Sequence, residues 1–206
     1  MKILSFRRFI KGLAENKGYM LTASALFVVA IVLGTLNADG LQRLLMSQLE
    51  GLRGVAGTLE DSEHVELSFF TFIFLNNAIK SLLVILLGAF FGLVPLVFLL
   101  LNGMVLGFVV GLANEQGQNV MELIFLGLLP HGIIELPAIV IACAYGLKFG
   151  GLVLGSLFSL GADKRERLGA RWEHGMRQML NAAIWIVILL FAAAIIESTL
   201  TYHLLR

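Results

Sequence analysis

An uncharged run, YMLTASALFVVAIVLGTL, extends from Tyr19 to Leu36. Its length is that of a helix that crosses the hydrocarbon core of a bilayer. A secretory signal peptide is the alternative, because the basic segment Met1–Gly18 precedes the run. However, the run is longer than a typical signal-peptide core, and no small-x-small cleavage site follows it in Leu36–Asp39. We therefore expect a retained transmembrane helix.

The composition of the whole chain agrees with a membrane location. Apolar residues make up 58% of the 206 residues, charged residues only 14%, and the mean hydropathy is +0.90. These values lie outside the range of soluble globular domains, and the length suits one helical bundle. The net charge of +1 does not favour nucleic acid as a partner. The single cysteine, Cys143, lies in an apolar run and excludes a disulfide framework.

Apolar segments separated by polar residues or prolines predict about five membrane spans in a single all-α, polytopic domain. Pro95 separates two of these segments, which are expected to form a tight hairpin, and Pro130 and Pro137 interrupt the fourth, which is expected to be a broken helix. The predicted spans are Tyr19–Leu36, Leu67–Val94, Leu96–Ala113, Val120–Leu147 and Gln178–Leu200.

The charged segments between the spans predict their orientation. Met1–Gly18 and the loop Gly161–Arg177 are basic and are expected in the cytoplasm, so the C-terminus should lie outside a cell membrane. Asn37–Glu66 is acidic and has leucines at three- and four-residue steps, which predicts an external amphipathic helix. Phe149–Leu160 is too short to span and is expected to extend a helix on the cytoplasmic side or to lie at the interface.

Three glycines at four-residue spacing, Gly103, Gly107 and Gly111, lie on one face of a predicted span. Small residues at this spacing allow two helices in a membrane to approach closely. Internal packing of the bundle is the favoured interpretation, and a homodimer seam is the alternative.

Several polar side chains are expected at membrane depth, where each needs a partner or a wet cavity. Lys80 lies far from either end of its span, and the carboxylate of Glu135 is the natural acceptor for its charge. The predicted buried polar cluster consists of Asn76, Asn77, Lys80, Asn102, His131 and Glu135.

The cluster has two interpretations. It can fix helix packing through interhelical hydrogen bonds, or it can form a proton or ion site in which Glu135 and His131 take part, as in a small transporter or channel. A metal-dependent intramembrane enzyme is a weaker alternative, because His131 and Glu135 supply only two ligands. The remaining histidines, His64, His174 and His203, lie in predicted loops or ends. We therefore expect no metal, no cofactor and no catalytic residue.

Three motifs resemble the stage II sporulation protein M family. They are Phe74-Leu75-Asn76-Asn77, Asn102-Gly103-xxx-Gly107 and Leu129-Pro130-His131-Gly132-Ile133-Ile134-Glu135, and the resemblance extends over about Ser68–Gly155. It implies a protein of the cytoplasmic membrane with about five spans. In spore-forming bacteria, members of this family assemble with murein-degrading partners and localise them during engulfment, without hydrolysing murein themselves.

The resemblance therefore implies a membrane scaffold or assembly factor whose partners are the lipid bilayer and other membrane or envelope proteins. Asn37–Glu66 is the segment expected to dock such a partner outside the membrane. No catalytic role for His131 or Glu135 follows from the resemblance.

Overall fold

The computed structural model describes residues 5–37, 64–158 and 162–204. These residues form helices and no strand, which confirms the all-α prediction. The elements are α1 (Phe6–Glu15), α2 (Lys17–Leu36), α4 (Val65–Leu87), α5 (Leu93–Glu115), α6 (Val120–Glu122), the π-helix η1 (Leu123–Leu128), α7 (Leu129–Leu157) and α8 (Ala162–Leu204).

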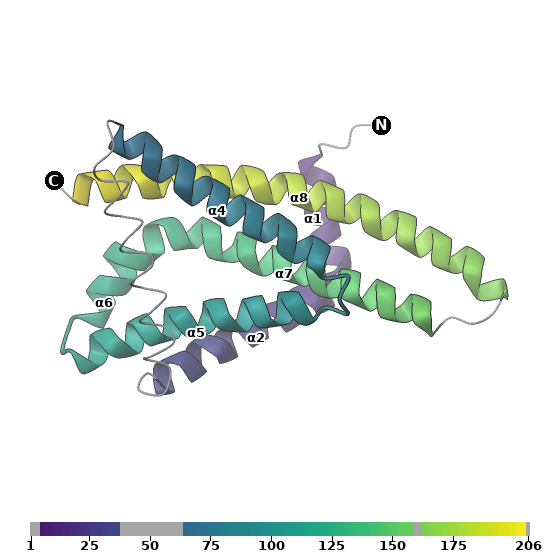
Figure 1. The fold of residues 1–206 in the computed structure, drawn as a ribbon, viewed down its shortest axis with the longest axis horizontal. Coiled ribbons are helices and arrows are strands. Elements are labelled where there is room, and N and C mark those ends of the chain that lie inside the picture. The colour runs from purple at the N-terminus through teal and green to yellow at the C-terminus, as the bar shows by residue number, and fades with distance from the viewer. Residues whose placement is uncertain (1–4, 38–63, 159–161, 205–206) are drawn as a thin grey trace.

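Five of the described helices, α2, α4, α5, α7 and α8, are long and apolar enough to cross a membrane. They lie side by side along the long axis of the molecule, and α1 crosses this direction (Figure 1). The first residues of α4, the last residues of α8 and the short helix α6 lie at one end of the bundle, which is called the Glu66 end. The other end holds α1 and the α4–α5 turn, and is called the α1 end. The predicted multi-pass bundle is confirmed.

α7 is the centre of the bundle. It packs against α2, α4, α5 and α8, and its membrane-spanning part is the most buried of the five candidates. Ala138, Ala142, Cys143 and Ala144 of α7 are fully or almost fully buried. Small side chains on this helix let four neighbours approach it, as close packing in a bilayer requires.

The glycines of α5 pack inside one chain. A Cβ atom at Gly107 would lie 2.0 Å from the Ile31 carbonyl oxygen of α2, and one at Gly103 would lie 2.6 Å from the Ala30 Cβ atom. The Thr35 hydroxyl donates a hydrogen bond to the Gly107 carbonyl oxygen, at 3.1 Å. Gly103 and Gly107 therefore pack against α2 of the same chain, as the internal-packing interpretation predicts. A homodimer would have to form through a face of α5 other than the one that carries these two glycines.

The hairpin between α4 and α5 turns earlier than predicted. α4 ends at Leu87, and the turn occupies residues 88–92, where Phe91 and Gly92 have positive φ angles of 56° and 78°. Pro95 is the third residue of α5 and does not separate the spans. The physical reason is that a helix tolerates proline in its first turn, where backbone N–H groups have no intrahelical partner.

The break in the fourth predicted span also lies elsewhere. α6 and η1 precede α7, and α7 continues through Pro137 as one helix. The wider turn of the π-helix, placed before Pro130, therefore marks the irregular segment. Figure 1 shows that the chain changes direction between α6 and α7.

The last helix is longer than one membrane span. α8 has 43 residues, about 65 Å at 1.5 Å per residue, against a hydrocarbon core of about 30 Å. The expected loop Gly161–Arg177 is therefore wrong, because residues 162–177 are helical. The Trp172 indole donates a hydrogen bond to the Ser156 hydroxyl at 2.7 Å, so the extended ends of α7 and α8 pack together. Phe149–Leu157 continues α7, as the prediction of a helix extension allows.

Most of the predicted external segment, Asn37–Glu66, lies outside the described residues. α1, which was not predicted as a helix, rests on α8. The Phe6 and Trp185 ring centroids are 4.9 Å apart, and the Phe9 ring, which is buried, lies 6.0 Å from the Trp185 ring. The aromatic contacts hold α1 across the bundle.

Candidate functional site

A chain of polar side chains connects α4, α7 and α8 inside the bundle. Asn76 Nδ2 donates to Asn77 Oδ1 at 3.3 Å, and Asn77 Nδ2 donates to Glu135 Oε1 at 2.9 Å. The carboxyl group of Glu135 also lies near that of Glu197 of α8. The polar chain thus brings together three of the predicted cluster residues and adds one that was not predicted.

Glu197 is half-buried and lies two residues before Thr199, whose hydroxyl group donates to Glu66 at the Glu66 end of the bundle. The Oε2 atom of Glu197 is buried and has no hydrogen-bond donor among the residues that the structure describes. Glu197 lies close to the end of the predicted span Gln178–Leu200 and was not among the predicted cluster residues. The signal that could have found it is a lone acidic residue inside an otherwise apolar helical run.

The other predicted members lie apart from the chain. Lys80 is exposed on α4, and no ion pair joins it to Glu135 in the described part of the protein. Its long apolar stem allows the ammonium group to reach toward a membrane surface. The Asn102 side chain donates to the Phe98 carbonyl oxygen of its own helix at 2.7 Å. The His131 side chain lies outside the described residues.

A second polar group of side chains lies at the α1 end. Asn16, between α1 and α2, donates to the Gln178 Oε1 atom of α8 at 2.9 Å. Lys148 of α7 donates to the same oxygen, and Gln178 Nε2 donates to Glu15. Lys148 is only 9% exposed, and its ammonium group lies 5.7 Å from the centre of the Tyr145 ring. These contacts attach the α1–α2 corner to α7 and α8.

Glu15 carries the negative charge of this second group. His174 lies 3.2 Å from its Oε2 atom, and Lys11 Nζ lies 3.6 Å from Oε1. Desolvation raises the pKa of Glu15, but the hydrogen bond with His174, the charge of Lys11 and the hydrogen bond from Gln178 lower it, and the net pKa lies below 4.5. Glu15 is therefore ionised at neutral pH and organises the α1 end.

An open pocket of about 420 Å³ adjoins this group. Basic side chains of α1 and α8 line it, with Glu15 as the acidic member: Arg8, Lys11, His174 and Arg177. Arg177 forms an ion pair with Glu173 of its own helix, and the negative charge of Glu173 offsets part of the positive charge around the pocket.

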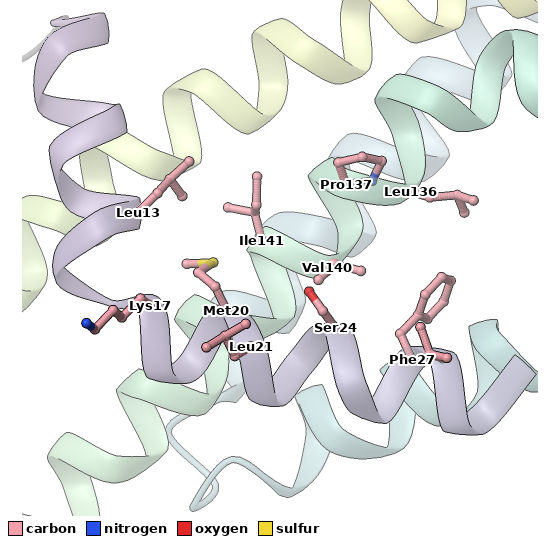
Figure 2. A pocket seen from close by; sticks show the side chains of 11 residues that line it. Leu13, Lys17, Met20, Leu21, Ser24, Phe27, Leu136, Pro137, Val140 and Ile141 are labelled. Atoms are coloured by element: carbon pink, nitrogen blue, oxygen red, sulfur yellow. The ribbon is translucent and has the colours of Figure 1, made fainter.

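A groove of about 590 Å³ runs between α2 and α7. Figure 2 shows Met20, Ser24 and Phe27 of α2 opposite Pro137, Val140 and Ile141 of α7. Lys17 lies at one end, and the other lining side chains are apolar except for Ser24. No acidic side chain lines the groove, so an ion entering it would meet an almost wholly apolar wall.

Within the described residues, no three or more histidine, cysteine, aspartate or glutamate side chains come together in a way that could hold a metal ion. The Asn76, Asn77 and Glu135 side chains instead form hydrogen bonds with one another, which lowers the cost of placing them in a hydrocarbon environment. The fold and this polar chain define a multi-pass helical membrane protein with an internal, side-chain hydrogen-bond network.

The family model of stage II sporulation protein M matches residues 23–202, and the chain belongs to this family. The match extends over α2 to α8 and so includes every residue of the polar chain.

Two archaeal relatives come from Methanocaldococcus jannaschii. The uncharacterized protein MJ0706 is 25% identical over 216 residues, which cover 100% of this chain and 91% of the relative. The uncharacterized protein MJ0793 is 33% identical over 131 residues, which cover 62% of this chain and 68% of the relative. No solved structure matches the chain significantly.

Proposed function

We propose that the chain is a membrane scaffold that binds partner proteins and holds them at one place in the membrane. The observation that carries this proposal is the polar chain, in which Asn77 donates to Glu135 and Glu197 lies near Glu135. Their contacts join α4, α7 and α8 into one body. A bundle with fixed helices can present a constant surface to a partner, and in this role the chain performs no chemical reaction itself.

The proposed docking segment is Asn37–Glu66, in which acidic side chains outnumber basic ones. Long-range attraction to a basic surface on the partner would favour encounter with this segment. A partner of this kind is another membrane or envelope protein.

Affinity capture from native membranes tests the scaffold. The wild-type chain should retain a reproducible partner, and a variant with Glu60→Lys, Asp61→Lys and Glu63→Lys should lose it, because the charge of the segment is reversed. A matched control is Arg167→Glu, which changes charge outside this segment. Equal capture by all three proteins, or no reproducible partner with the wild type, would contradict the proposal.

A proton or ion transporter is the second candidate, because two carboxyl groups meet inside the bundle at Glu135 and Glu197. Flux into proteoliposomes separates the two functions. A scaffold should give the background flux with both the wild type and Glu135→Gln. Wild-type flux above background that Glu135→Gln abolishes would replace the scaffold with the transporter.

A further inference from the structure

The open groove between α2 and α7 has the length of one membrane leaflet. On α2 it extends from Lys17 to Val28, eleven positions further along, or about 16 Å at 1.5 Å per residue. The hydrocarbon core of a bilayer is about 30 Å thick, so one leaflet of it is about 15 Å deep. Lys17 precedes the uncharged run of α2, and Leu136 of α7 lies near Phe27 at the other end of the groove (Figure 2). The groove therefore begins at a membrane surface and ends near the middle of the bilayer.

The wall of the groove suits a hydrocarbon chain. Its volume of about 590 Å³ lies within the range of about 300–1,000 Å³ that is typical of small-molecule sites. Apart from Lys17 and Ser24, the described side chains that line it are apolar. Leu21 and Val28 are 68% and 58% exposed, so apolar surface remains open along the groove. A chain that fits between the two helices gains van der Waals contacts with both of them.

Lys17 places a positive charge at the surface end of the groove. Its side chain is exposed and forms no ion pair with a residue that the structure describes. Glu15, the acidic residue nearest in sequence, contacts Lys11 and His174 instead. A basic side chain at a membrane surface attracts lipids whose headgroups carry a net negative charge. The charge and the apolar wall thus match the two parts of an anionic phospholipid.

A transmembrane helix of a partner, or of a second copy of this chain, fits the groove less well. Helices that pack closely in a membrane meet through small side chains, which let their backbones approach. The side chains of Met20, Phe27 and Leu136 are large, and the small residues Ala23 and Ala30 of α2 are already buried within the bundle. A spanning helix would also extend beyond the groove into the other leaflet.

We propose that the groove between α2 and α7 binds one anionic phospholipid, with an acyl chain against Met20, Phe27 and Val140 and the phosphate group at Lys17. The bound lipid ties the corner between α1 and α2 to α7. This site goes beyond the proposed scaffold and does not depend on it.

Native mass spectrometry of the full chain, released from detergent micelles, tests the site. The chain is titrated with phosphatidylglycerol and, separately, with phosphatidylcholine that carries the same oleoyl chains. The wild type should bind one phosphatidylglycerol more tightly than any further lipid and more tightly than phosphatidylcholine. Lys17→Gln should weaken this binding about fivefold, the contribution of one basic side chain near a membrane surface. Lys11→Gln, at the same end of the bundle, is the control and should leave it unchanged.

Two adjacent residues of α2 distinguish the groove from the rest of the lipid-facing surface. Ser24 lines the groove, whereas Ala25 is also exposed but does not line it. Ser24→Trp should abolish the tight site, because the indole ring fills the groove, and Ala25→Trp should keep it. If Ser24→Trp is not monodisperse, Val28→Trp in the groove and Val29→Trp outside it form a second pair with the same expected difference.

Several results would overturn the site. They are the absence of a tighter first lipid, equal binding of the two lipids, and the same result with both members of a tryptophan pair. Equal weakening by Lys17→Gln and Lys11→Gln would assign the attraction to the general charge of the α1 end and likewise overturn it. Displacement of the lipid by inorganic phosphate alone would replace the lipid site with a phosphate site. A dimer that Ser24→Trp dissociates would assign the groove to a second copy of the chain instead.

Discussion

Asn77 and Lys80 are one helical turn apart on α4 but meet different surroundings. The Asn77 amide faces α7 and donates to Glu135, whereas the Lys80 side chain is exposed. A polar group inside a bundle is stabilising only when its hydrogen bonds are made, and an exposed lysine can carry its charge to a membrane surface along its apolar stem. The two residues should therefore respond oppositely to replacement by leucine.

Asn77→Leu should lower the free energy of unfolding by about 1–3 kcal/mol, because it removes a hydrogen bond to a partly buried carboxyl group. Lys80→Leu is the matched control on the same helix and should leave the stability unchanged or raise it. Unfolding in mixed detergent micelles measures both. A larger loss with Lys80→Leu than with Asn77→Leu would show that the lysine is the buried member of the pair.

Glu15 gives the α1 end a dependence on pH. Its pKa is lower in the folded protein than the ordinary value of 4.5, because contacts with His174, Lys11 and Gln178 outweigh desolvation. A lowered pKa contributes stability that is present above the unfolded value and is lost as the pH falls through the folded value.

The unfolding temperature of the wild type should therefore fall as the pH drops below about 4.5, and Glu15→Gln should reduce this dependence. Thermal unfolding at a series of pH values in detergent measures the effect. Glu173→Gln, which removes an exposed ion pair with Arg177 on α8, is the control and should keep the wild-type pH dependence. Parallel curves for the wild type and Glu15→Gln would contradict the assignment.

At the scale of the helical elements, glycine determines which helices touch. Gly103 and Gly107 bring α5 against α2, and Gly146 and Gly150 bring α7 against the α4–α5 turn. A Cβ atom at Gly150 would lie 2.2 Å from the Gly92 nitrogen. Because lipid provides no hydrophobic driving force between helices, the van der Waals attraction between closely approaching backbones holds these pairs together.

Gly107→Ala should destabilise the bundle by about 1–3 kcal/mol, because the new methyl group meets the backbone of α2 and cannot be relieved by a side-chain rotation. Gly18→Ala on α2 is the control, since nothing lies within 4 Å of its Cβ position. It should be neutral or slightly stabilising. Unfolding in mixed micelles compares them, and equal stability of the two variants would show that α2 and α5 are not in close contact.

At the scale of the whole molecule, the distribution of charge and the number of crossings fix the predicted topology. Five crossings by the five candidate helices predict that the two ends of the chain lie on opposite sides of the membrane. The basic segment Met1–Gly18 favours a cytoplasmic N-terminus. We therefore expect the α1 end, with Arg8, Lys11 and Arg177, to face the cytoplasm.

Single cysteines at Lys2 and Leu205 should react differently with an impermeant thiol reagent added to whole cells. Leu205→Cys should be labelled in intact cells, and Lys2→Cys only after the membrane is opened. The native Cys143 is buried and provides the unlabelled background. Labelling of Lys2→Cys in intact cells would reverse the orientation, and equal labelling of both would exclude an odd number of crossings.

The sequence by itself predicted a lipid bilayer as the environment, an all-α fold and the approximate positions of the membrane spans. Apolar runs of membrane length have this consequence because a backbone in hydrocarbon must form its hydrogen bonds internally. The sequence also placed Asn77 and Glu135 in one predicted polar cluster, although it paired the Glu135 carboxylate with Lys80 and not with Asn77. The helix ends were less well predicted, because a proline such as Pro95 is equally compatible with a turn and with the first turn of a helix.

Only the tertiary structure decided which polar side chains meet. The rotation of α4 places Asn77 toward α7 and leaves Lys80 exposed, and the antiparallel return of α8 brings Glu197 to Glu135, 62 positions along the chain. The four-residue spacing of Gly103 and Gly107 was visible in the sequence, but their partner, α2, was not. The physical reason is that a helix sequence fixes which residues share a face, whereas the packing of several helices fixes what that face touches.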